Sequence, residues 1–188
     1  MSDFVNALKR IATFKKYICN MKNLVLLTFL IILIASCKHK EIPSVESKLD
    51  WSSRTITLLP DSMTIGTTYL PIYSEVYHLR EDRTHDLTAT ISMRNPNRAD
   101  SIYIESAKYF NTQGKEVRTY FDQYIYIAPM ETVQIVIEEK DKEGGAGASF
   151  LFNWSVKPDL NEPIFEGVMI STSGQQGLSF KTKGIRVD

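Results

Sequence analysis

The chain has 188 residues, and its 22 lysine and arginine residues balance its 22 aspartate and glutamate residues. A hydrophobic content of 43% and an aromatic content of 11% exclude a fully disordered protein, and two cysteines are too few for a disulfide scaffold. The balanced charge gives no indication of binding to nucleic acid.

The charge is unevenly distributed along the chain. Residues 1–36 hold five basic residues and one acidic residue, which leaves 17 basic and 21 acidic residues, a net charge of −4, in residues 37–188. The basic residues precede an apolar run, 24–35, in which only Thr28 is polar. This run is shorter than the roughly 20 residues that span a bilayer, but it matches the hydrophobic region of a secretion signal. A short buried helix and an uncleaved membrane anchor are the weaker alternatives.

The apolar run ends in a four-residue lipobox, Ile-Ala-Ser-Cys, whose last residue is Cys37. The basic region, the apolar run and the lipobox follow one another in the order that bacterial lipoprotein precursors use. Residues 1–36 are therefore predicted to be a signal peptide, and Cys37 is predicted to carry lipid chains on its sulfur and its amine. The expected location is the cell envelope, at the outer membrane, on its periplasmic or surface side.

The first twenty residues are not needed for this signal, because Met21 already opens a complete one. Residues 1–20 indicate either a start assigned too far upstream or a long basic region. In both cases Cys19 would leave with the signal peptide, so the mature chain would carry no free thiol, which suits an extracytoplasmic compartment.

The mature chain is expected to begin with a tether and to continue as one domain, 55–188. Residues 37–54 contain a proline, several serines and mixed charges, which are typical of a flexible linker, and Trp51 is the first candidate to dock on a core. Alternation is clearest over 87–94, where apolar residues at every second position oppose Thr, Thr, Ser and Arg. Further strands are expected at 55–58, 69–77, 102–110, 132–138, 150–156, 167–172 and 178–180.

Turn-forming residues separate these expected strands. They lie at 94–98, 111–114, 128–129, 144–147, 158–163 and 173–174. Short strands at this spacing predict an all-β fold, an immunoglobulin-like β-sandwich of about seven to nine strands. No window after residue 37 has a convincing helical stripe.

Three tyrosines, Tyr69, Tyr73 and Tyr77, recur at intervals of four residues. The spacing could fit a helix, but Pro71 in the middle favours one long strand. On such a strand the three tyrosines and Pro71 share a face. If exposed, this face offers an aromatic platform for a glycan, a peptide or another protein. If that face is buried, the tyrosines belong to the core, and alternation alone does not decide between the two.

A glycine-rich segment, 144–147, follows several acidic residues that include Asp141. The glycine spacing of a phosphate loop is absent, and a strand rather than a helix is expected next. Such a segment either brings its backbone close to a ligand or partner, or forms a turn with positive φ. Asp141, Gly144, Gly145 and Gly147 are therefore candidate binding residues. The acidic residues lack the spacing of a calcium loop and are interleaved with lysines.

The sequence carries no recognisable catalytic motif. Of its histidines, His39 lies in the tether, and His78 follows Ser74 by four residues, about 13 Å along a strand. Neither a nucleophile elbow nor a zinc-like spacing is present. We therefore expect no enzymatic activity, no cofactor and no metal. A cryptic hydrolase that uses two carboxylates distant in sequence is the weaker alternative.

Six segments, taken in order, resemble one family. They are 66–77 (GTTYLPIYSEVY), 87–95 (LTATISMRN), 109–114 (YFNTQG), 141–150 (DKEGGAGASF), 153–154 (NW) and 168–180. The chain resembles, over about residues 60–186, the domain of unknown function numbered three-one-two-four, an uncharacterised family of bacterial lipoproteins and secreted proteins. Glu75 and Ser149 depart from its pattern, standing where histidine and asparagine are common, which weakens a catalytic role for either. The resemblance implies an extracytoplasmic β domain and no established activity, cofactor or partner.

These observations predict a lipid-anchored protein of the cell envelope that serves as a non-catalytic binding or structural module. Its expected partners are the membrane, through Cys37, and another envelope protein or a glycan. The alternative is a glycan or small-ligand binder that uses the tyrosine face and the glycine-rich segment.

Overall fold

The computed structural model describes residues 50–57, 59, 62–172 and 177–188. The predicted signal peptide, Cys37 and most of the predicted tether lie outside the described residues. So does Leu58, in the strand expected at 55–58.

In its described residues the chain forms eleven β-strands and two short 3₁₀ helices, η1 (Trp51–Arg54) and η2 (Gly145–Gly147). The strands are β1 (Thr64–Ile72), β2 (Glu75–His78), β3 (Arg80–Asp86), β4 (Thr88–Arg94), β5 (Ile102–Phe110), β6 (Glu116–Ile127), β7 (Thr132–Ile137), β8 (Ala148–Val156), β9 (Ile164–Ser171), β10 (Leu178–Lys183) and β11 (Ile185–Arg186). No helix in this part of the chain is long and apolar enough to cross a membrane.

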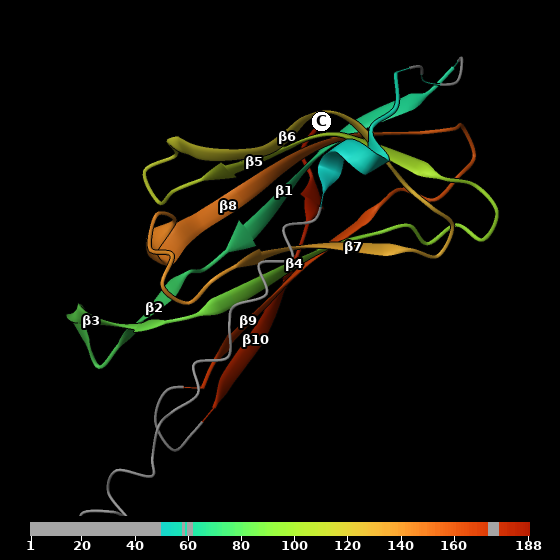
Figure 1. Cartoon of the computed structure of the whole chain (residues 1–188). Coiled ribbons are helices and arrows are strands. Elements are labelled where there is room, and N and C mark those ends of the chain that lie inside the picture. Colours follow the sequence, from blue (N-terminus) through green and yellow to red (C-terminus); the bar gives the residue numbers. More distant parts are fainter. Residues whose placement is uncertain (1–49, 58, 60–61, 173–176) are drawn as a thin grey trace, which may run out of the picture. The chain divides into compact units, whose positions relative to one another are not determined.

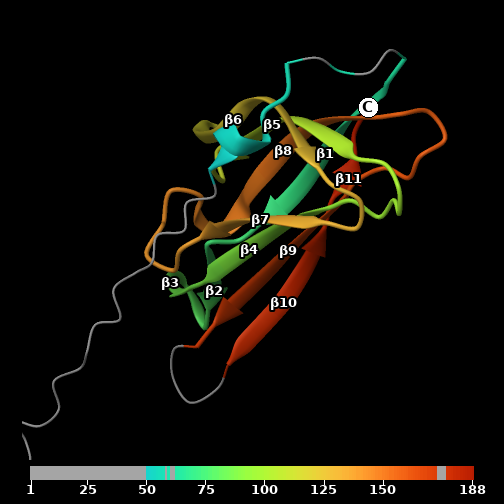
Figure 2. The same ribbon diagram turned by 45° about the vertical axis from the view of Figure 1, so that its right-hand side comes forward.

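Nine of these strands form the two layers of a β-sandwich (Figures 1 and 2). One sheet has the order β11-β1-β8-β5-β6 and the other the order β10-β9-β4-β7, with antiparallel neighbours throughout. β2 and β3 pair with each other as a separate hairpin that continues from β1 and leads into β4. The predicted all-β sandwich is confirmed, and its nine strands agree with the expected number.

The alternation predicted over 87–94 is confirmed. Leu87, Ala89, Ile91 and Met93 are fully buried, whereas Arg94 on the opposite face of β4 is exposed. At the β6 edge of the first sheet, Trp51 of η1 packs on Phe121 with 4.7 Å between ring centroids, which fits its expected role as the first docking residue.

A row of aromatic rings runs through the core. Phe150 and Phe152 of β8 lie 5.4 Å apart between ring centroids, and Tyr109 of β5 stacks on Phe150 at 4.9 Å. Phe152 stacks on Phe165 at 4.4 Å. Because Phe165 belongs to β9 of the opposite sheet, this contact joins the two layers. Each such pair contributes about 1 kcal/mol beyond the burial of its area.

Trp154 of β8 explains the glycine that stands opposite it in β1. A Cβ atom at Gly66 would lie 2.2 Å from the indole ring, so the ring occupies the space that any side chain would need. The indole nitrogen donates a hydrogen bond of 2.9 Å to Thr68 Oγ1, which satisfies this buried donor. The Arg186 guanidinium lies 5.1 Å from the Trp154 ring centroid.

Three asparagines, Asn95, Asn97 and Asn161, connect the loops at the end of the sandwich where β4 finishes, and we call them the asparagine corner. The Asn95 amide nitrogen donates to three main-chain oxygens. These belong to Asp100, Ile127 and Ala128, at 2.8, 3.0 and 3.0 Å. Asn95 Oδ1 accepts from both nitrogens of Asn97, whose own amide bonds to the Asn161 main chain. The corner thereby ties together the loops that follow β4, β6 and β8.

The single strand expected over 69–77 is wrong, because the chain leaves the first sheet after Ile72. Ser74 N donates to Gly145 O, and Leu87 N donates to Ser74 O. These bonds hold Ser74 between two sheets instead of continuing β1. Tyr77 therefore belongs to a different sheet from Tyr69.

Two long strands, β3 and β6, have no counterpart among the expected strands. β3 consists of charged and polar residues (REDRTHD), because it lies in a hairpin outside the sandwich and its side chains are mostly exposed or half-buried. β6 is an edge strand whose pairing with β5 shifts register at several points, which disrupts the period-two pattern.

Candidate functional site

The predicted candidates Asp141, Gly144, Gly145 and Gly147 lie together in the loop that connects β7 to β8 (Figure 1). This loop packs beside the start of the β2–β3 hairpin, because Gly145 O accepts hydrogen bonds from Ser74 N and Ser74 Oγ, at 3.2 and 3.0 Å. The glycine-rich segment and the hairpin therefore meet at the same end of the sandwich.

Arg118 of β6 holds the acidic part of this loop. Its Nη2 atom lies 2.8 Å from Asp141 Oδ2 and 2.5 Å from Glu143 Oε2, and its Nη1 donates to Tyr120 Oη at 3.0 Å. Although burial alone would lower it, the hydrogen bonds to Asp141 and Tyr120 raise the pKa of Arg118. The Arg118 charge is therefore permanent, and two carboxylates already neutralise it, so it is not available to bind an anion.

Gly144 presses against the hydroxyl of Tyr109. A Cβ atom at this position would stand 1.8 Å from Tyr109 Oη. The hydroxyl is buried without a hydrogen-bond partner among the described residues. Burial raises the pKa of Tyr109 to about 12, and the lowering effect of the nearby Ser74 hydroxyl on this pKa is smaller. The phenol stays protonated at neutral pH and is not suited to act as a general base. We call Tyr109, Arg118, Tyr120, Asp141 and Gly144 the glycine-loop cluster.

The other two glycines also face the protein's own chain. Gly145 has a φ of +70°, which residues with a side chain rarely adopt. Gly147 N donates to Thr112 Oγ1 at 3.0 Å, and a Cβ atom at Gly147 would lie 3.3 Å from Thr112 Cγ2. The turn with positive φ, one of the two interpretations of this segment, is present at Gly145. The close backbone approach is also present, and the side chains approached are Tyr109 and Thr112 of the protein itself.

The three tyrosines of the predicted platform come from different elements. Tyr69 lies on the outer face of β1 and is 39% exposed. Tyr73 follows the end of β1 and packs edge-on against Phe180 of β10, with 5.6 Å between ring centroids. Tyr77 lies on β2 and is 67% exposed. The structure does not bring these tyrosines together on one face.

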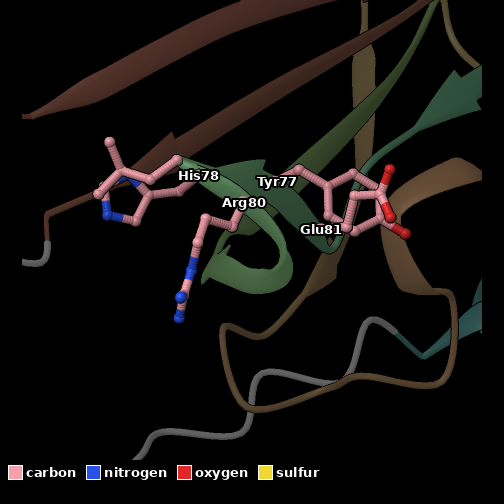
Figure 3. Close-up of a pocket in the computed structure, with 5 residues that line it drawn as sticks. Tyr77, His78, Arg80 and Glu81 are labelled. Atoms are coloured by element: carbon pink, nitrogen blue, oxygen red, sulfur yellow. The ribbon is translucent and has the colours of Figure 1, made fainter.

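The tip of the β2–β3 hairpin is a surface feature that the sequence did not indicate. An open hollow there is lined by Tyr77, His78, Leu79, Arg80 and Glu81 (Figure 3). Leu79 is 81% exposed and has a φ of +61°, a conformation that is uncommon for a residue with a side chain. With Tyr77, which is 67% exposed, Leu79 gives the tip an apolar surface.

Ser74 and His78 do not form a nucleophile–base pair. Ser74 Oγ donates to Gly145 O, and the ring of His78 stacks on that of His85. Among the residues that the structure describes, no group of three or more histidine, cysteine, aspartate or glutamate side chains is placed to hold a metal ion.

Comparison with known proteins gives a family and one distantly similar solved structure. Residues 65–187 match the family described as "Protein of unknown function (DUF3124)". No curated protein matches the chain. A solved structure described as "Crystal Structure of Thermotoga maritima 1070" is similar, with 11% sequence identity and a TM-score of 0.42, over 64% of this chain and 92% of that chain. The family match begins in β1 and extends past β11, so it includes both sheets and the hairpin.

Proposed function

The chain belongs to the family described as "Protein of unknown function (DUF3124)", and we propose that it is a lipid-anchored, non-catalytic binding module of the bacterial cell envelope. The observation that carries the anchoring is the lipobox at Cys37, placed directly after a basic region and an apolar run. This order of segments is what a lipoprotein signal requires.

Lipid chains on Cys37 would keep the β domain close to the membrane. Each buried methylene contributes about 0.8 kcal/mol, so two or three acyl chains give stable attachment where one gives only reversible binding. Trp51, which contacts the core, is 14 residues after Cys37. That length of chain spans at most roughly 50 Å when fully extended. Trp51 would therefore stay within about 50 Å of the lipidated residue.

The use of the polar side chains supports a role without catalysis. Arg118 and Asp141 fix the loop that carries the glycines, and Asn95 and Asn97 fix the loops at the other end. Among the exposed apolar side chains of the described residues, Tyr77 and Leu79 lie together at the hairpin tip and offer apolar surface to a partner. Another envelope protein is the partner that such a protruding apolar tip favours.

The glycan-binding alternative has less support. Stacking on a sugar needs neighbouring exposed rings on one surface. Tyr69 and Tyr77 belong to different sheets, and Tyr73 is committed to its contact with Phe180.

Metabolic labelling with a palmitate analogue tests the anchoring. In a bacterium that expresses the full chain, we expect the protein to take up the label and to sediment with membranes. Cys37→Ser should lose both properties, because the acceptor thiol is gone. Cys19→Ser is the matched control and should keep both. A chain that starts at Met21 should behave as the full chain does.

The contrary result is equally clear. An unlabelled protein that stays in the soluble fraction from both start positions would show that Cys37 is not an acceptor and would remove the basis of the proposal.

A further inference from the structure

Two histidine rings stack on one face of the β2–β3 hairpin. The ring centroids of His78 and His85 are 4.1 Å apart, and the ring planes differ by 29°. His85 pairs with Val76 across the hairpin, and the pairing shifts register between Tyr77 and His78, so the ring contact joins β3 to the irregular end of β2. In Figure 3 the His78 side chain extends to the opposite side of the hairpin from Tyr77 and Glu81.

Neither imidazole forms a hydrogen bond or an ion pair with the residues that the structure describes. Several polar side chains of the hairpin are paired with partners other than these rings. Thr84 Oγ1 donates to Glu75 at 2.9 Å, Lys142 pairs with Asp86 at 3.1 Å, and Arg80 pairs with Asp82 at 3.1 Å. Two adjacent rings thus hold ring nitrogens that no described group uses, although each imidazole has one donor and one acceptor to satisfy.

This arrangement suits a divalent transition-metal ion. Imidazole nitrogen binds zinc at about 2.0–2.1 Å and is also a preferred ligand of copper and nickel. Two nitrogens that share one such ion lie roughly 3 Å apart, so rings with centroids at 4.1 Å need only turn about their side-chain torsions. Both donors are nitrogens, whereas Ca²⁺ and Mg²⁺ take oxygen ligands.

We propose that His78 and His85 form a two-histidine site for a divalent transition-metal ion, with water in the remaining coordination positions. Cu²⁺ should bind more tightly than Zn²⁺, following the general order of affinity of such ligands. A bound ion would cross-link β2 to β3 and would hold the strained turn at Leu79 in place. The site would thereby stiffen the tip that exposes Tyr77 and Leu79.

Titration with Cu²⁺, followed by electron paramagnetic resonance, tests this proposal. The full-length chain is used with Cys19→Ser and Cys37→Ser, so that neither thiol competes for the ion. We expect one bound Cu²⁺ with nitrogen couplings from two imidazoles. His78→Ala and His85→Ala should each weaken binding by about tenfold or more, since removing even an outer-shell partner of a ligand costs that much. His39→Ala, in the predicted tether, is the matched control and should leave both affinity and spectrum unchanged.

Hydrogen exchange gives an independent measurement. Cu²⁺ should slow exchange of the β2 and β3 amides in the chain with both histidines and should have no such effect in either alanine variant. If an alanine variant loses the β signal in circular dichroism, His85→Gln, which keeps a polar side chain of similar size, replaces it. Equal Cu²⁺ affinity in all variants, or coupling to fewer than two imidazoles, would overturn the proposal.

Discussion

The asparagine corner and the glycine-loop cluster lie at the two ends of the same sandwich. They differ in whether their buried polar groups are hydrogen-bonded. In the corner, Asn95 and Asn97 are buried, and the amide nitrogen and oxygen of each are hydrogen-bonded. In the cluster, the Tyr109 hydroxyl is buried without a partner and pressed against Gly144. An unmade buried hydrogen bond costs about 1–3 kcal/mol, so the second end carries a cost that the first avoids.

The hairpin with its stacked imidazoles lies at the same end as the glycine-loop cluster, since β2 follows directly after Ser74. Residues with positive φ occur at both ends, Leu79 in the hairpin and Met130 and Asp159 in the loops of the corner. Proteins tolerate local cost where function requires a particular geometry. The two ends therefore differ in how completely their buried polar groups are hydrogen-bonded, and this difference indicates that the corner serves stability.

Replacing the central amide of the corner should have the largest effect on stability. Asn95→Ala leaves three main-chain oxygens and both Asn97 nitrogens without this partner in a buried site. We expect a loss of about 3 kcal/mol in the free energy of unfolding, measured by urea denaturation.

The matched control for this change is Asn111→Ala. Asn111 also accepts two main-chain hydrogen bonds through its side chain, but in an exposed turn. Its loss should cost only about 1 kcal/mol, because water replaces the missing partner. Equal losses in the two variants would contradict the view that the corner is the stabilising end.

A smaller effect is expected from adding one methyl group in the glycine-loop cluster. Gly144→Ala places a Cβ atom within 1.8 Å of Tyr109 Oη, so the loop or the ring must move. Overpacking of this kind costs about 2 kcal/mol, measurable as a lower thermal midpoint. Tyr109→Phe removes the unpartnered hydroxyl and should by itself be nearly neutral.

The double variant decides whether the contact itself is the cause. With Tyr109→Phe in place, Gly144→Ala should cost measurably less, because the nearest atom is gone. The same cost in both backgrounds would show that the contacts with Ala148 Cβ and the ring carbon Tyr109 Cζ, each 2.7 Å from the added Cβ, are the cause, and not the contact with the hydroxyl.

The parts of the fold that the sequence predicts are those with a local period. The strand over 87–94 was predictable because its apolar residues alternate and all face one core. The break after Ile72 was not, because it depends on the hydrogen bonds that Ser74 donates to Gly145 O and accepts from Leu87 N, and both partners are distant in sequence. β3 was missed for a related reason, since its charged residues face solvent and carry no buried stripe.

The candidate sites show the same division. Glycine composition alone indicates that 144–147 is a special loop, and the positive φ of Gly145 agrees with that interpretation. Nothing in the sequence connects this loop to Arg118 or Tyr109, which approach it from β6 and β5. The stacking of His78 on His85 likewise depends on a hairpin turn at Leu79, a residue with no turn preference.

The smallest effect should come from an ion pair near the asparagine corner, and it should depend on pH. Arg54 makes two hydrogen bonds to Glu131, at 2.6 and 3.0 Å, and these hold the pKa of the Glu131 carboxyl below its ordinary value. A lowered pKa in the folded state adds stability above the unfolded value, about 4.3. That stability is lost as the pH falls through the lower, folded value.

Glu131→Gln should therefore cost about 1 kcal/mol at pH 7, and the difference from the unmodified protein should be smaller at an acidic pH, below the unfolded value of about 4.3. Urea midpoints at the two pH values measure this difference. Glu162→Gln, which removes the exposed partner of Arg186, is the control and should change stability less. If the loss of stability in Glu131→Gln is the same at the two pH values, the charge of the Glu131 carboxylate is not what stabilises the contact with Arg54 of η1. The cost of the Gln variant would then come from a change in the hydrogen bond that Ala128 N donates to Glu131 Oε2 at 2.8 Å.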